Sequence, residues 1–126
     1  MINPEDIIQF TFSQGAEVRY VAIRWNGIIT KKQRSGVENS SSSDSDYYEE
    51  QIVNPALLLL AKQRGDIDCG GLDHIIVSYG NFFQIVAHLA NGHISICIEK
   101  HAFPEEFAKR TFPAFKERFP DLYRNQ

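Results

Sequence analysis

Three residues whose types could support catalysis, Asp73, His88 and Ser95, are spread over the second half of the chain. An acid, an imidazole and a hydroxyl can act as a triad when hydrogen bonds join them in that order. The register that we expect for three neighbouring strands places them side by side on one sheet face. A cross-strand row of polar side chains on a half-covered face explains the same placement. We favour this structural explanation, because no strained turn presents the serine and no oxyanion loop is evident.

The sequence also lacks the spacings that hold metal ions and phosphates. None of the four histidines lies in H-E-x-x-H or a similar pair: His74, His88, His93 and His101. Cys69 and Cys97 are far apart and form no C-x-x-C motif. The glycines fit neither G-x-x-x-x-G-K-[ST] nor G-x-G-x-x-G. We therefore expect no catalytic, cofactor-binding or metal-binding residues, and no enzyme.

Length and charge restrict the classes of protein to consider. The 126 residues suit one domain, which we expect to span residues 1–126. A net charge of −3 argues against a nucleic-acid surface, which needs a basic excess. No apolar run approaches the length of about 20 residues that a membrane span requires. The first residues show no signal-peptide pattern, so we expect a cytoplasmic protein with reduced thiols.

Cap and turn signals divide the first half of the chain. Asn3 and Pro4 are a capping residue and a first-turn proline, so a short helix begins there, and Gly15 can close it. Asn26-Gly27 separates two apolar runs and predicts a hairpin of Val18–Trp25 with Ile28–Gln33. The serine-rich stretch after it, residues 35–46, predicts a flexible loop.

Helical character resumes at Tyr47, and the central helix is expected to begin at Asn54-Pro55, to run to about Arg64 and to end at Gly65. Tyr47–Val53 is then a preceding turn or a kinked extension of this helix. Its four consecutive leucines, Leu57–Leu60, surround most of the helix, because successive residues are about 100° apart. A helix that is apolar all round must be buried on more than one side.

The remaining sequence predicts a three-stranded meander and a last helix. Strands over residues 74–79, 82–90 and 93–99 are separated by Gly80-Asn81 and Asn91-Gly92, which we interpret as two-residue turns. This register collects one apolar set on a core face: Ile76, Phe83, Ile85, Ala87, Leu89, Ile94, Ile96 and Ile98. The last helix starts at Phe103-Pro104, and Pro113 should bend or interrupt it.

Together these elements predict an α+β fold. Their order is helix, two strands, helix, three strands, helix. The opposite face of the meander is about half apolar, so helices should cover both faces of the sheet. We expect one central five-stranded antiparallel sheet with the leucine helix on one face and the terminal helices on the other.

This element order resembles that of the roadblock / dynein light chain family, whose fold is related to the profilin-like sheet. The local likeness is strongest in GLDHIIVSYGNFFQIV, residues 71–86, and in GHISICIE, residues 92–99. The first hairpin, Val18–Arg24 followed by Asn26-Gly27, is also similar to the family's. The short first helix, Pro55 and the serine-rich stretch depart from the pattern.

The resemblance covers essentially the whole chain and carries no catalytic residues. It implies a homodimer, or a dimer with a paralogous roadblock chain. It also implies partners such as Ras-like small GTPases, motor subunits or signalling scaffolds, since bacterial relatives regulate a polarity GTPase.

The strand over residues 74–79 provides a physical reason for such a dimer. It is the outer strand of the meander unless the first hairpin joins on that side, and it has no Pro, Lys or charge between Ile75 and Tyr79. An exposed strand of this kind is an aggregation template, and pairing with its own copy around a two-fold axis removes the hazard. The expected interface joins this strand to the leucine helix: Leu57, Leu58, Ala61, Ile75, Ile76, Val77 and Tyr79.

We therefore expect a non-enzymatic dimeric interaction module that regulates or scaffolds a Ras-like small GTPase or a motility or signalling complex. The alternative is a profilin-like or PAS-like small-molecule sensor. That function needs a pocket of about 300 Å³ or more between sheet and helix, lined by the face of Tyr79, Phe82 and His88. A hydrolase that uses Asp73, His88 and Ser95 is a third, weaker hypothesis.

Overall fold

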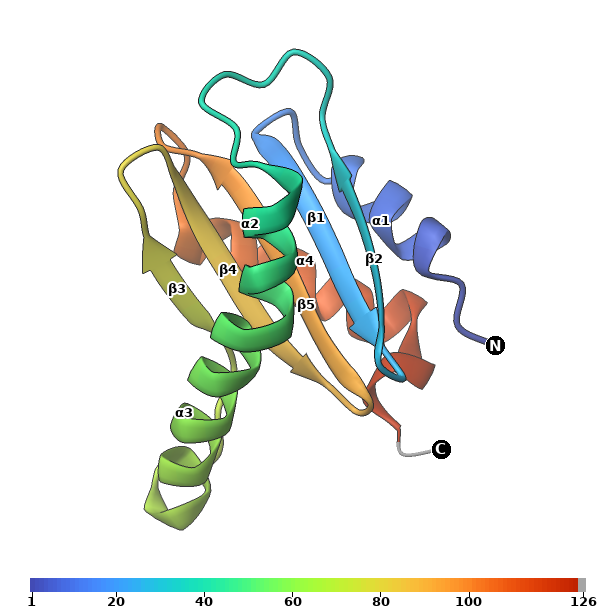
Figure 1. Ribbon diagram of the computed structural model, residues 1–126. Helices are drawn as coiled ribbons and strands as arrows, with labels where there is room; N and C mark the ends of the chain where they lie inside the picture. The colour runs from blue at the N-terminus through green and yellow to red at the C-terminus, as the bar shows by residue number, and fades with distance from the viewer. Residues whose placement is uncertain (125–126) are drawn as a thin grey trace.

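The computed structural model describes residues 1–124 (Figure 1). Helices and strands follow one another along the chain as α1 (Pro4–Phe12), β1 (Val18–Trp25), β2 (Ile28–Gln33), α2 (Ser43–Tyr48), the π-helical turn η1 (Glu49–Val53), α3 (Asn54–Asp68), β3 (Ile75–Ser78), β4 (Phe82–Leu89), β5 (Gly92–Glu99), α4 (Pro104–Arg118) and the 3₁₀ turn η2 (Pro120–Tyr123).

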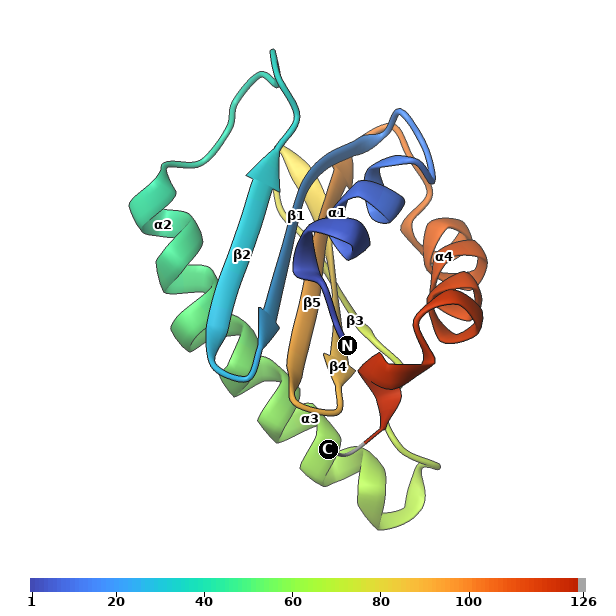
Figure 2. The same cartoon turned by 90° about the vertical axis from the view of Figure 1, so that its right-hand side faces the viewer.

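The strands form one antiparallel sheet in the order β2-β1-β5-β4-β3. Helices α1 and α4 cover one face, and the continuous helical segment α2–η1–α3 crosses the other (Figure 2). The predicted α+β fold, with five antiparallel strands between helical layers, is confirmed. Both the first hairpin and the position of β3 at a sheet edge agree with the sequence analysis.

The main hydrophobic core lies between the sheet and the pair α1 and α4. Ile85 and Ile96 are fully buried there, together with Phe107 and Phe115 of α4. All eight residues expected on the core face of the meander belong to this cluster or pack against it. The face assignment made from the sequence is therefore confirmed.

The register between β4 and β5 differs from the expected one by two residues. The turn is formed by Ala90 and Asn91, and Gly92 is already in β5, opposite Leu89. On its other side Gly92 pairs with Trp25, where a Cβ atom would lie 1.7 Å from the Arg24 carbonyl oxygen. This position therefore needs glycine inside the strand rather than in the turn. A shift of two residues keeps every side chain on its face, which explains why the core was still predicted correctly.

The central helix starts earlier than expected. Ser42 caps α2, and its Oγ accepts a hydrogen bond of 3.1 Å from the Ser45 amide. Residues 43–46, expected in the flexible loop, are therefore helical. Asn54 has helical backbone angles in the middle of the segment, and Gly65 lies inside α3. The expected cap at Asn54 and the expected end at Gly65 are both wrong.

Proline explains the π-helical turn that replaces the expected helix start. Pro55 has no amide hydrogen, and its ring would clash with the carbonyl group four residues earlier in a regular α-helix. The Asn54 amide donates instead to the Glu49 carbonyl, five residues back, so the ladder widens just before the proline. In α4, Pro113 is accommodated without a break, because it lies on the exposed side of the helix where water can reach the freed carbonyl.

Prediction for the β4–β5 turn. Gly92→Ala should lower the free energy of unfolding by about 3 kcal/mol or more, since its methyl group would overlap the β1 backbone. Urea denaturation measures this change. Gly80→Ala is the matched control, because an added Cβ meets no atom within 4 Å there. Equal midpoints for the two variants would contradict the observed register.

Candidate interaction surface

Strand β3 leaves one row of backbone groups without a partner inside the sheet. The Tyr79 amide donates to the Phe82 carbonyl at 3.0 Å. In an antiparallel ladder, successive residues point alternately toward and away from the neighbouring strand. The amides of Ile75 and Val77 therefore face β4, and those of Ile76 and Ser78 lie at the free edge.

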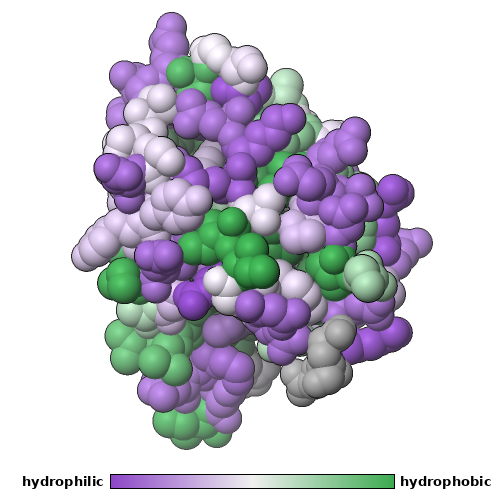
Figure 3. Space-filling model, turned by 45° about the vertical axis from the view of Figure 1, so that its right-hand side comes forward, coloured by the Kyte–Doolittle hydropathy of each residue, from purple (hydrophilic) through white to green (hydrophobic). Residues whose placement is uncertain are grey.

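Helix α3 extends beyond the sheet (Figure 1). Only Asn54, Leu58 and Gly65 of its fifteen residues are buried, so its outer half has little cover from its own chain. Large apolar side chains are exposed along the helical segment: Tyr47, Tyr48, Ile52, Leu59, Leu60 and Ile67. Apolar side chains also gather over α3 at the lower end of the molecule in Figure 3.

The members of the expected interface have different environments. Leu58 is 1% exposed, because it packs against its own sheet, so it does not face outward. Leu57, Ala61, Ile75, Ile76 and Val77 are half-buried, and Tyr79 is exposed. The leucines that do face outward are Leu59 and Leu60, which the sequence analysis did not select. We define the α3–β3 surface as Leu57, Leu59, Leu60, Ala61 and Ile67 together with residues 75–79.

A buried polar cluster fixes the helical segment to the sheet beneath this surface. Glu50, in the π-helical turn, has no exposed area. Its Oε1 accepts from Asn54 Nδ2 at 2.9 Å and lies 2.8 Å from His93 Nε2 of β5. Its Oε2 accepts from the Tyr20 hydroxyl of β1 at 2.9 Å. One carboxylate thus joins the helix to two neighbouring strands.

Burial governs the titration of the groups around this cluster. The pKa of Tyr20 is raised well above its ordinary value, mainly by burial and secondly by the nearby Glu50 carboxylate. Burial also raises the pKa of Glu49, although Tyr79 donates to that carboxylate at 3.0 Å. The pKa of the Cys97 thiol is likewise raised, first by burial and then by the Glu50 carboxylate.

The structure does not assemble the candidate triad. His88 lies opposite His93, and Ser95 lies opposite Val86. Ser95 Oγ accepts from Gln84 Nε2 at 3.0 Å, and His88 Nε2 contacts the Leu58 carbonyl at 3.3 Å. Asp73 is exposed and precedes the start of β3. Asp73 and His88 line one open hollow of 320 Å³, but Ser95 is not part of it. Within residues 1–124, no group of three or more His, Cys, Asp or Glu side chains could hold a metal ion.

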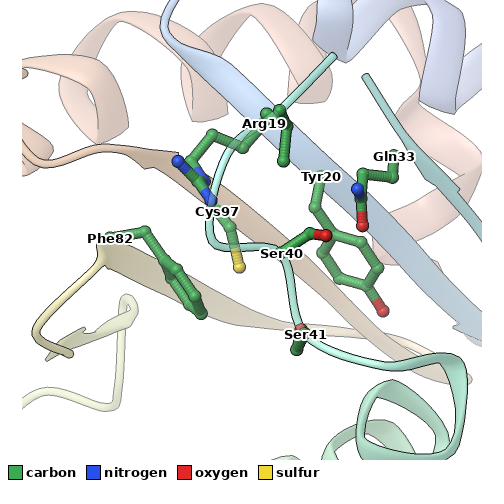
Figure 4. Close-up of a pocket in the computed structure, with 8 residues that line it drawn as sticks. Arg19, Tyr20, Gln33, Ser40, Ser41, Phe82 and Cys97 are labelled. Carbon is green, nitrogen blue, oxygen red and sulfur yellow. The ribbon is translucent and has the colours of Figure 1, made fainter. Parts of the chain in front are cut away.

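The sheet face under the helical segment has three separate hollows rather than one deep pocket. A hollow of 180 Å³ is lined by Tyr79 and Phe82, and an open groove of 350 Å³ is lined by His88 and His93. A third, adjoining hollow, between Arg19, Phe82 and Ser41, has a volume of only 10 Å³, the space of about one water (Figure 4). The pocket expected for a sensor, with Tyr79, Phe82 and His88 on one wall, is thus divided.

Comparison with known proteins identifies the fold. MglB, a gliding protein from Thermus thermophilus, superposes with a TM-score of 0.58 at 13% identity, over 85% of this chain and 81% of that one. A second MglB structure, which has a tetrameric arrangement, gives 0.63 at 12% identity, over 95% and 87%. The chain shares the fold of MglB. No family model and no curated protein sequence matches it.

The match to MglB confirms the roadblock-like fold that the element order suggested. At this low identity, it is the backbone arrangement that MglB and this chain have in common. None of the described helices is long and apolar enough to span a membrane.

Sequence reasoning missed the Glu50 cluster. Its residues lie in β1, η1, α3 and β5, and no spacing along the chain connects them. A weak signal was present, because Asn54 and Glu50 are four residues apart and therefore share a helix face. That signal was hidden when Asn54 was interpreted as a cap.

Prediction for the buried cluster. Tyr20→Phe should lower the free energy of unfolding by about 1–3 kcal/mol, since Glu50 Oε2 loses its donor in a site that water does not reach. Urea denaturation at pH 7 measures the loss. Tyr48→Phe removes an exposed hydroxyl and should change the stability by less than about 0.5 kcal/mol. A similar small change in both variants would mean that the cluster does not hold the helix.

Proposed function

We propose that this chain is a non-enzymatic, cytoplasmic interaction module that self-associates through the α3–β3 surface and regulates or scaffolds a Ras-like small GTPase. The observation that carries the proposal is an apolar helix face, exposed over Leu59, Leu60 and Ile67, on an element connected to an unpaired strand edge. A paralogous roadblock chain could take the place of the second copy.

The free energy available from the helix face is sufficient for association. Burying a leucine side chain contributes about 1.5–3 kcal/mol, so Leu59 and Leu60 together contribute about 3–6 kcal/mol before the entropy cost of association. The free amides of Ile76 and Ser78 add strand pairing across the same two-fold axis. Such pairing would also protect an edge strand that carries no charge between Ile75 and Tyr79.

The GTPase part of the proposal rests on the roadblock-like fold and on the resemblance described above. The unassembled Asp73, His88 and Ser95 support a role without catalysis. The divided hollows favour an interaction module over a small-molecule sensor, because the part lined by Tyr79 and Phe82 is smaller than drug-sized ligands require.

Prediction for self-association. Sedimentation velocity at tens of micromolar should detect a dimer or larger assembly, and Leu60→Asp should weaken it at least tenfold, because a carboxylate would be buried at the contact. Ile28→Asp is the matched control, since Ile28 is equally exposed but lies in the β1–β2 turn region. A monomeric wild-type chain would eliminate the homodimer and leave only the paralogous pair.

The strand edge can be tested separately. Ser78→Pro removes an amide that faces away from β4, so the sheet should remain intact while the assembly weakens. Ser78→Ala is the control, because it removes the hydroxyl contact with Lys100 Nζ but keeps the amide. If both variants associate equally well, β3 is not at the contact.

Prediction for the GTPase. The purified chain should bind a Ras-like GTPase differently in its GDP and GTP states and change its rate of GTP hydrolysis, while binding no nucleotide itself. Calorimetry and phosphate-release kinetics measure both effects, with Leu60→Asp and wild type compared. An unchanged hydrolysis rate, with no GTPase captured from native lysate, would refute this part of the proposal.

A further inference from the structure

A row of basic residues crosses the sheet on the face below α3. Arg24 of β1 lies opposite His93 of β5, and His93 lies opposite His88 of β4. Their neighbours Ile23, Ile94 and Ala87 point into the main core, so the three basic side chains point to the helical side.

The row lies in the open groove of 350 Å³, which we term the basic groove. Its lining consists of Arg24, Pro55, Leu58, Leu59, Lys62, His88, Gly92 and His93. Lys62 contributes a further basic group from α3, and none of the lining residues carries a carboxylate. This concentration of basic groups contrasts with the net charge of −3 of the whole chain.

The basic residues of the groove differ in whether another residue of the chain supplies a hydrogen-bond or ion-pair partner. His93 contacts Glu50, and Lys62 is paired with Asp66. The Leu58 carbonyl can only accept, so the Nε2 of His88 carries the hydrogen in their 3.3 Å contact. Arg24 is half-buried and makes no side-chain hydrogen bond or ion pair with any residue from 1 to 124. Its five N–H donors are therefore available.

An anion would satisfy this arrangement. His93 and Lys62 already face the carboxylates of Glu50 and Asp66, whereas Arg24 has no carboxylate partner among residues 1–124. The planar guanidinium group matches carboxylate and phosphate oxygens with two parallel hydrogen bonds. The apolar wall of Pro55, Leu58 and Leu59 excludes part of the water and strengthens such bonds.

We propose that the basic groove binds an oxyanion, a phosphate or carboxylate group, with Arg24 as the principal donor and Lys62 and His88 beside it. The anion is either a free small molecule or an acidic side chain of a partner protein. The groove shares Leu59 with the α3–β3 surface, but the proposal requires neither the dimer nor the GTPase, because it rests on the charge and geometry of the groove.

Titration with inorganic phosphate tests the proposal. Ring C–H signals of the histidines are followed by NMR at pH 7, with chloride adjusted so that the ionic strength stays constant. We expect a saturable shift of the His88 signal and none of His101, which lies outside the groove. Arg24→Gln should weaken binding at least fivefold. Arg64→Gln, which removes the same charge from an exposed site on α3, should weaken it less than twofold.

Arg24→Lys keeps the charge but loses the planar fork, so its affinity should fall between those of wild type and Arg24→Gln. This variant also provides the comparison if Arg24→Gln does not fold. Two results would overturn the proposal. One is a His88 shift that stays linear up to about a 50-fold excess of phosphate over about 1 mM protein. The other is equal phosphate affinity of the Arg24→Gln and Arg64→Gln variants.

Sedimentation in the presence of phosphate distinguishes the two sources of the anion. In the first case, phosphate competes with an assembly of the wild type, either self-association or GTPase binding. If Arg24→Gln weakens that same assembly equally in the absence of phosphate, the groove receives a partner's carboxylate. If phosphate binds and the assemblies are unchanged, the groove belongs to a free small anion.

Discussion

The buried carboxylate of Glu50 determines where the helical layer lies on the sheet. Removing a carboxylate from water is costly unless hydrogen bonds replace the lost solvation. Here, donors come from Tyr20 on β1, from Asn54 on the helix itself and from His93 on β5. Because these partners are on three elements, sliding the helix by even one residue would leave several buried groups unsatisfied. The helix register, and with it the choice of which leucines are exposed, follows from this constraint.

Pro55 and Glu50 act together in this arrangement. The proline makes a regular α-helical turn unfavourable, and the resulting π-helical turn directs Glu50 and Asn54 toward the sheet together. The carboxylate then holds this turn against the sheet through Tyr20 and His93. It also holds His93 at the end of the basic groove, so the polar cluster and the groove share one imidazole.

The sequence predicted the features that arise from local physics. Asn26-Gly27 set the first hairpin, and alternating apolar residues in β4 and β5 identified the core face. It did not predict features that depend on contacts between distant segments. The glycine of Asn91-Gly92 was assigned to the turn, because its close contact with the Arg24 carbonyl is visible only once β1 lies beside β5. Asn54-Pro55 has the composition of a helix start, and only the cap at Ser42 and the buried Glu50 make it a helix interior.

The outer half of α3 has a consequence for dynamics. Beyond Leu58, Gly65 is the buried residue of this helix end. The Gly71 backbone packs against it so closely that a Cβ atom on Gly65 would lie 3.0 Å from the Gly71 carbonyl oxygen. A helix end held by so few buried groups opens locally at a lower free energy than the sheet, and its amides exchange with solvent sooner. A protein that binds there must first order this end, so part of its interaction energy goes into rigidity. Binding of a partner at α3 would therefore also stiffen the segment that leads into β3.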